Sequence, residues 1–145
     1  MPIKINIPIP PKAQQRVRHA VRGKHAMAYK SKSQQAAEDT FNAFLLSQRP
    51  PKPLTGALKL TVRAYMPIPK SKPKWWRESA RLGRIVPTTK PDLDNLMKFA
   101  KDCFTQMNVW ADDKQVVEYG EGTGKYYSDE PRWEIEISEV DNAIR

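Results

Sequence analysis

The chain has 145 residues, a formal net charge of +9 and 39% hydrophobic residues, which suits one globular domain with a single core. No apolar run is long enough to cross a bilayer, and the first residues do not resemble a signal peptide. The single cysteine, Cys103, cannot form an internal disulfide. These features exclude a membrane-spanning or disulfide-stabilised protein and lead us to expect a cytoplasmic one.

Charge is unevenly distributed along the chain. Residues 1–90 carry 19 Lys and Arg against 3 Asp and Glu, whereas residues 91–145 carry 6 against 13. A basic segment of this size predicts a polyanionic partner, most often nucleic acid. An anionic membrane is less favoured, because no predicted helix is both basic and strongly amphipathic. A soluble protein with a merely basic surface is the alternative.

The N-terminal third predicts a strand, a basic loop and a helix. Isoleucines at alternate positions of 3–9 predict a half-buried strand, and the prolines between them place it at a sheet edge. A basic loop with room for a short strand follows. Ser31 and Gln34 have the spacing of a capping box, and the apolar positions after them predict a helix over 32–48 that Pro50 ends.

The middle of the chain predicts the clearest strand and a long basic connection. Residues 57–66 alternate between apolar and polar side chains. The connection over 67–91 carries seven Lys or Arg, with one short helix expected over 74–81. A loop of this length in a compact domain is usually functional or disordered. Trp75 and Trp76 could stack on exposed bases, although a tryptophan more often packs on its own domain.

The last third predicts a helix and two closing strands. Apolar residues at helical spacing over 93–107 predict an amphipathic helix packed on the core. Strands are expected over 116–127 and 132–138. Together the elements predict a single domain over 1–145 of the α/β (α+β) class, a mixed sheet of about four strands with two main helices packed on it.

Carboxylates gather on both sides of this last helix. Asp92 and Asp94 lie at its start, and two positions within a helix diverge by about 200°. The two side chains can therefore converge only if Asp92 lies outside the helix, as its N-cap. Negative charge is favoured at that end by the helix dipole. Lys98 follows Asp94 by one turn on the same face, and Asp112 and Asp113 follow the helix.

Each carboxylate also has an ordinary structural explanation. Asp92 can cap the helix, and Asp94 with Lys98 can form a surface ion pair worth roughly a few tenths of a kcal/mol. A carboxylate cluster beside a lysine in a basic protein instead suggests a hard cation such as Mg²⁺. One or two carboxylates typically hold this ion together with waters and substrate phosphate. The ion would activate water against a phosphate, and the basic surface would hold DNA or RNA over it.

Other chemistries fit the sequence less well. The segment "DLDNLM" lacks the glycine of a calcium loop at its sixth position, where Met97 stands, and one Cys with two His gives no zinc site. The glycines of 120–125 precede Lys125, but Tyr126 follows in place of Ser or Thr and the surrounding pattern is that of a strand. We interpret these glycines as part of a bulge or a hairpin.

Two segments, "KPDLDNLMK" and "WADDKQV", lie on either side of the helix with a fixed spacing from Asp92 to Asp113. They resemble the RusA family of Holliday-junction resolvases of bacteria and phages. Its pattern is Lys-Pro-Asp-x-Asp-Asn-x-x-Lys, a helix, and Trp-x-Asp-Asp-x-Gln-Val. A weaker likeness in the N-terminal segment and the basic connection extends the resemblance to roughly residues 3–137.

The resemblance implies a Mg²⁺-dependent endonuclease, with Mn²⁺ as a substitute, that acts in DNA recombination and repair in a bacterial or phage-infected cell. Such an enzyme works as a homodimer on four-way DNA junctions and nicks two strands of like polarity symmetrically. By matching position, Asp92, Asp94 and Asp113 would be catalytic and bind the metal. Asp112 would be a further ligand or a neighbour of the site.

The same matching implies roles for nearby residues. Lys98 would be the catalytic lysine near the scissile phosphate, and Asn95 would orient a carboxylate or cap the helix. Basic residues of the first 90 positions are the candidates for DNA contact: Arg16, Arg18, Lys24, Lys70, Lys72, Lys74 and Lys90.

Two other functions stay open at this point. One is a non-catalytic basic DNA-binding protein whose aspartates only cap and solvate a helix. The other is a nuclease that prefers flaps or replication forks. A metal site shared by Asp92, Asp94 and Asp113 predicts that their carboxylates lie within about 5 Å of one another.

Overall fold

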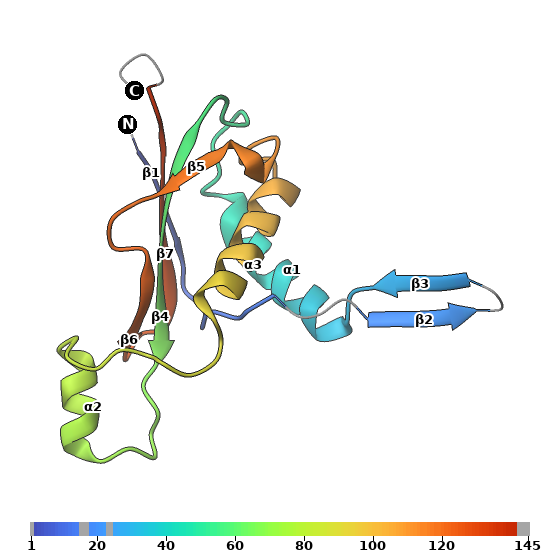
Figure 1. Ribbon diagram of the computed structural model, residues 1–145. Coiled ribbons are helices and arrows are strands. Elements are labelled where there is room, and N and C mark those ends of the chain that lie inside the picture. The colour runs from blue at the N-terminus through green and yellow to red at the C-terminus, as the bar shows by residue number, and fades with distance from the viewer. Residues whose placement is uncertain (1, 15–17, 23–24, 142–145) are drawn as a thin grey trace.

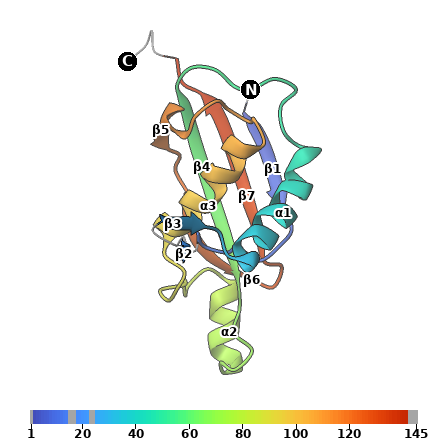
Figure 2. The ribbon, with the colours of Figure 1, turned by 90° about the vertical axis from the view of Figure 1, so that its right-hand side faces the viewer.

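The computed structural model describes residues 2–14, 18–22 and 25–141, and over 18–22 and 25–29 it describes the backbone alone. Within these residues the body of the molecule is one mixed five-stranded sheet with helices packed on one face (Figures 1 and 2). The fold class predicted from the sequence, a small α+β domain, is confirmed. No described helix has both the length and the apolar character needed to cross a membrane.

The strands of the sheet come from both ends of the chain. β1 (Ile3–Ile7) pairs antiparallel with β7 (Arg132–Glu139), which pairs antiparallel with β4 (Leu58–Pro67). On its other side β4 pairs in parallel with two short strands, β5 (Val116–Tyr119) and β6 (Gly124–Ser128). β1 therefore lies at an edge, as its prolines predict, and β4 lies at the centre.

The described residues form three α-helices next to the sheet. α1 (Lys32–Leu46) and α3 (Leu93–Gln106) cover one face, whereas α2 (Lys74–Arg81) stands beyond the end of β4 (Figures 1 and 2). All three were predicted from the sequence to within two residues. The predicted N-cap of α1 is also confirmed, because the Ser31 hydroxyl accepts a hydrogen bond from the Gln34 amide at 3.1 Å.

Aromatic side chains fix α1 and α3 against the sheet. Phe41 of α1 lies edge-on against Phe99 of α3 and Trp133 of β7, with ring centroids 5.5 and 5.4 Å apart. Phe99 in turn stacks on Trp133 at 5.9 Å. All three side chains are buried, and burying one phenylalanine contributes about 1.5–3 kcal/mol. The orientation of α3 on the sheet therefore follows from its core contacts.

Two features differ from the sequence prediction. The basic segment after β1, expected as a loop with room for a short strand, forms a separate two-stranded hairpin of β2 (Arg18–Arg22) and β3 (His25–Tyr29). This hairpin projects from the body beside the helices (Figure 1). The single strand expected over 116–127 is divided into β5 and β6, so the sheet has five strands where about four were predicted.

A bulge divides β5 from β6. Leu60 of β4 faces Tyr119 and Arg63 faces Gly124, so the four residues 120–123 lie opposite only two. A side chain at Gly120 would overlap the Thr61 hydroxyl, which explains why glycine is needed there. Gly122 has a φ of +92°, a conformation that glycine adopts readily. The bulge interpretation of the glycines is thus confirmed.

Candidate functional site

The first two aspartates of the motif lie at the start of α3. Asp92 occupies the N-cap with an extended backbone (φ −67°, ψ 146°), and Asp94 lies in the first turn. The Asp92 side chain makes no capping hydrogen bond, so the helix does not use this carboxylate. Because Asp92 lies outside the helix, the structure meets the condition under which the two side chains can converge.

The polar face of α3 is open to solvent. Asp92, Asp94 and Lys98 are all exposed. Among the ion pairs of the described residues, none joins Asp94 to Lys98, so the simple surface pair is not formed. Asn95 is half-buried, and its backbone carbonyl accepts a hydrogen bond from the backbone amide of Gln14 at 3.1 Å. The roles expected for the Asn95 side chain and for Lys98 stay predictions.

The opposite face of α3 is part of the core. Its buried residues are Leu96, Met97, Phe99, Ala100, Cys103 and Phe104. Burial, together with the nearby negative charges of Glu38 and Asp102, raises the pKa of the Cys103 thiol far above its usual value. Cys103 is therefore an inert core residue, and the chemistry of α3 is confined to its exposed face.

The segment that carries the third aspartate is held by its tryptophan and glutamine. Trp110 is buried, and its indole donates to the Thr105 hydroxyl at 2.8 Å. Gln115 accepts from the amides of Ala111 and Asp112 at 2.9 and 3.1 Å. Its side-chain amide donates to two carbonyls in the 54–56 segment at 3.0 and 3.1 Å. The motif spelling Trp-x-Asp-Asp-x-Gln thus includes two scaffold residues, a division of roles that the pattern alone did not show.

Asp112 and Asp113 have different environments. Asp112 caps the short 3-10 helix η1 (Asp113–Gln115) by accepting from the Lys114 amide at 2.9 Å, which lowers the pKa of Asp112. Its carboxylate therefore has a structural task. Asp113 is exposed at the start of η1. Burial and, after it, the charge of Asp113 raise the pKa of Asp102. The Asp102 side chain is half-buried, and its carboxyl lies close enough to Asp113 to feel that charge.

The carboxylates do not form a closed metal site. Among the described residues, no three His, Cys, Asp or Glu side chains are placed together to hold a metal ion. The structure therefore does not show the three-carboxylate group within 5 Å that the metal hypothesis predicts. The donor chemistry does fit Mg²⁺: Asp92 and Asp94 offer exposed oxygen ligands, and one or two carboxylates suffice when waters and a substrate phosphate complete the shell.

Comparison with protein families decides the class. The model of the family "Endodeoxyribonuclease RusA" matches residues 8–138, from just after β1 to the penultimate residue of β7. The chain belongs to the RusA endodeoxyribonuclease family. Membership confirms the resemblance seen in the two motif segments and the prediction of an endodeoxyribonuclease.

Two relatives illustrate how far the RusA likeness extends. The protein named "Uncharacterized protein YqaN" of Bacillus subtilis (strain 168) is 39% identical over 142 residues, which covers 95% of this chain and 96% of that protein. The crossover junction endodeoxyribonuclease RusA of Lactococcus phage r1t is 40% identical over 84 residues, 57% of this chain and 55% of the phage protein. The individual residue roles stay predictions.

Of the basic residues expected to contact DNA, all but Lys90 lie outside this RusA motif. Lys70, Lys72, Lys74 and Lys90 are exposed, as DNA contact requires. Arg16 and Lys24 lie outside the described residues, and of Arg18 only the backbone, in β2, is described.

The two tryptophans of the basic connection differ. Trp76 packs on Tyr127 at 5.4 Å, and Lys72 lies 5.1 Å above its ring. Trp75 is 65% exposed. Packing on the domain therefore holds for Trp76, and Trp75 is the aromatic face that stays available for a base.

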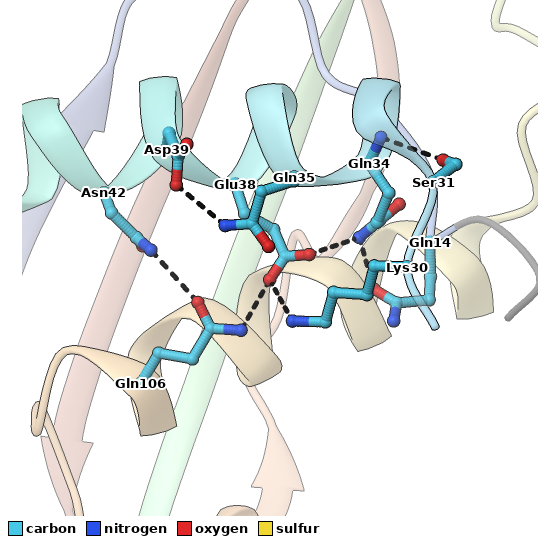
Figure 3. Close-up of polar contacts among 9 residues, drawn as sticks. All are labelled: Gln14, Lys30, Ser31, Gln34, Gln35, Glu38, Asp39, Asn42 and Gln106. Carbon is cyan, nitrogen blue, oxygen red and sulfur yellow. Dashed lines mark hydrogen bonds and ion pairs between the residues drawn. The ribbon is translucent and has the colours of Figure 1, made fainter. Parts of the chain in front are cut away.

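A buried carboxylate anchors the base of the hairpin (Figure 3). Glu38 of α1 accepts hydrogen bonds from Lys30 at 2.7 Å, Gln34 at 2.9 Å and Gln106 at 2.5 Å. Gln34 also donates to Gln14 at 3.3 Å. Burial alone would raise the pKa of Glu38, but the three hydrogen bonds and the charge of Lys30 outweigh it and lower the pKa. Gln14 and Lys30, on either side of the hairpin, are thereby joined to α1 and α3.

Proposed function

We propose that this chain is a crossover junction endodeoxyribonuclease, which hydrolyses phosphodiester bonds of four-way DNA junctions by symmetric paired nicks in recombination and repair. The observation that carries the proposal is the start of α3, where Asp92 takes the N-cap position without capping and Asp94 follows in the first turn. Membership of the RusA endodeoxyribonuclease family and the name of the phage r1t relative support it.

Asp92, Asp94 and Asp113 are the residues that would hold Mg²⁺, or Mn²⁺ in its place. When bound, such an ion lowers the pKa of water and stabilises charge on the attacked phosphate. The carboxylates orient the reacting groups. Lys98 is exposed one turn beyond Asp94 without forming an ion pair with it. Its ammonium is free to neutralise charge that develops on the phosphate oxygens.

DNA contact is assigned to the candidates Arg16, Arg18, Lys24, Lys70, Lys72, Lys74 and Lys90. The excess of 19 Lys and Arg over 3 Asp and Glu in the first 90 residues would attract the phosphate backbone. A homodimer suits the substrate, because a two-fold protein offers the same site to each of two equivalent strands of a nearly two-fold junction.

Asp94→Asn is the direct test of the nuclease site. The variant keeps the size of the side chain and removes its charge. We expect Mg²⁺-dependent cleavage of a four-way junction to fall by at least about 100-fold, while junction binding measured in EDTA is unchanged. Asp39→Asn, at an exposed position of α1, is the matched control and should cleave normally. Cleavage by Asp94→Asn at the wild-type rate would contradict the assignment.

A non-catalytic DNA-binding protein is the second candidate, and the lack of a preassembled three-carboxylate group among the described residues favours it. It predicts salt-sensitive binding of the junction but no products in Mg²⁺ or Mn²⁺. Without products, it has no cleavage preference to show among DNA substrates.

Cleavage rates of a junction, a flap and a linear duplex of shared sequence, measured in parallel, distinguish the junction enzyme from a nuclease that prefers flaps or forks. The sedimentation coefficient of the wild-type protein tests whether it is a dimer.

A further inference from the structure

Lys125 of β6 projects toward the helix-covered side of the sheet. It faces Ala64 of β4 in the parallel register, and Ala64 is fully buried in the core beneath the helices. Residues that face one another on adjacent strands project from the same side. A lysine at this position brings an ammonium group against the inner layer, where an unpartnered charge is costly.

The partners of this ammonium are backbone carbonyls of the loop before α3. Lys125 Nζ donates to the carbonyls of Thr89 and Pro91, each at 2.8 Å. These two carbonyls lie on either side of Lys90, and Pro91 directly precedes Asp92. Among the ion pairs of the described residues, none involves Lys125. The charge is thus directed at the backbone that leads into the candidate site.

The orientation of the two aspartates depends on that backbone. Asp92 makes no capping hydrogen bond, and both Asp92 and Asp94 are exposed. Residues 88–90 are exposed as well and form no helix or strand. Lys125 therefore ties this loop to the sheet through two charge-assisted hydrogen bonds, a strong kind.

We propose that Lys125 is a positioning residue of the nuclease site. By holding the carbonyls of Thr89 and Pro91 it fixes the backbone at the N-cap of α3, and with it the direction in which the Asp92 and Asp94 carboxylates point. The inference rests on the proposed function, because it takes these two carboxylates as the metal ligands. Groups that orient ligands in this way typically change metal affinity by 10–100-fold when they are removed.

The bulge between β5 and β6 serves the same arrangement. It interrupts the strand with a turn at 120–123, after which β6 pairs with β4 in the register that sets Lys125 opposite Ala64. The glycines of "GEGTGK", which matched no phosphate-binding pattern, therefore have a place in the site. They set the position from which Lys125 reaches the loop.

The test compares Lys125→Met, which keeps most of the length of the side chain but has no donor, with Lys125→Arg and Lys59→Met. Lys59 is an exposed residue of β4 and serves as the control. The first measurement is Mn²⁺ affinity of the free protein by electron paramagnetic resonance. We expect Lys125→Met to bind Mn²⁺ at least 10-fold more weakly than wild type. Lys125→Arg, which retains donors, should recover part of the loss, and Lys59→Met should equal wild type.

The second measurement is junction cleavage at saturating DNA, with the thermal unfolding midpoint recorded for each variant. Lys125→Met should lose at least 10-fold in kcat, whereas Lys59→Met should keep the wild-type kcat. Wild-type Mn²⁺ affinity in a folded Lys125→Met, or no Mn²⁺ binding by the wild-type protein, would overturn the inference. If the wild-type protein binds Mn²⁺ but cleaves no junction, the proposed function fails, while the Mn²⁺ comparison still decides the role of Lys125.

Discussion

At the scale of single residues, the aspartates of the motif divide into those that the backbone uses and those that it leaves free. Asp112 and Asp92 both stand at the N-cap of a helix. The Asp112 carboxylate accepts a hydrogen bond from the Lys114 backbone amide of η1, as a cap should, whereas the Asp92 side chain makes no capping bond to α3. The sequence could not separate the two, because an aspartate before a helix is typical of both roles.

This difference predicts unequal effects on stability. Asp112→Ala removes a cap and should lower the free energy of unfolding by more than Asp92→Ala does. Asp92→Ala removes only a charge near the helix dipole and should lower it by no more than about 0.5 kcal/mol. Urea unfolding followed by circular dichroism measures both values. An equal or larger loss for Asp92→Ala would mean that Asp92 is a cap after all.

At the scale of elements, the spacing of apolar residues predicted the helices and strands whose pattern is local. The alternation of 57–66 became β4 and the helical spacing of 93–107 became α3. The hairpin was not predicted, because "RHAVRGKHAMAY" is short and has no clear alternation. The division of 116–127 depends on Gly120 meeting Thr61, a contact between segments far apart in sequence. The sequence likewise could not show that Lys125 bonds to the backbone carbonyls of Thr89 and Pro91, because these residues are far from it in the chain.

Contacts between elements also predict how stability depends on pH. The pKa of Glu38 is lowered in the folded protein, so its contribution to stability is present above the unfolded pKa of about 4.5 and is lost as the pH falls through the folded value. Glu38→Gln should lower the free energy of unfolding by about 1–3 kcal/mol at pH 7, since three donors lose a charged acceptor.

The measurement is chemical unfolding of wild type and Glu38→Gln between pH 3 and 7. The difference between the two proteins should shrink as the pH drops below about 4. Asp39→Asn, one position along α1 but exposed, should show a much smaller difference at pH 7. A difference for Glu38→Gln that stays constant over the whole range would contradict the role given to its charge.

At the scale of the whole molecule, two basic segments extend away from the body that carries the aspartates. The connection with α2 stands beyond the end of β4, and the β2–β3 hairpin projects beside the helices (Figures 1 and 2). Composition predicted a polyanionic partner. It could not predict that the two basic segments lie on different sides of one small sheet, because their placement follows from the topology of β4 and α1.

Replacing Lys70, Lys72 and Lys74 together by alanine tests the DNA role of the connection. Each lysine that contacts a phosphate adds about 1 to the slope of log K against log salt, so the slope should fall by up to about 3. Cleavage at saturating DNA should be retained. The matched variant removes the same charge from the exposed Lys4, Lys52 and Lys59. Equal losses of junction affinity in the two variants would show that only total charge matters.

The bulge at 120–123 has a consequence for how this chain can diverge. Side chains of β6 alternate with a period of two, so the pairing of Lys125 with Ala64 keeps the lysine on the helix-covered side. A slip of one residue in that pairing would turn it to the opposite side, away from the loop before α3. Insertions and deletions at 120–123 that natural selection tolerates should therefore be those that leave the register of β6 on β4 unchanged.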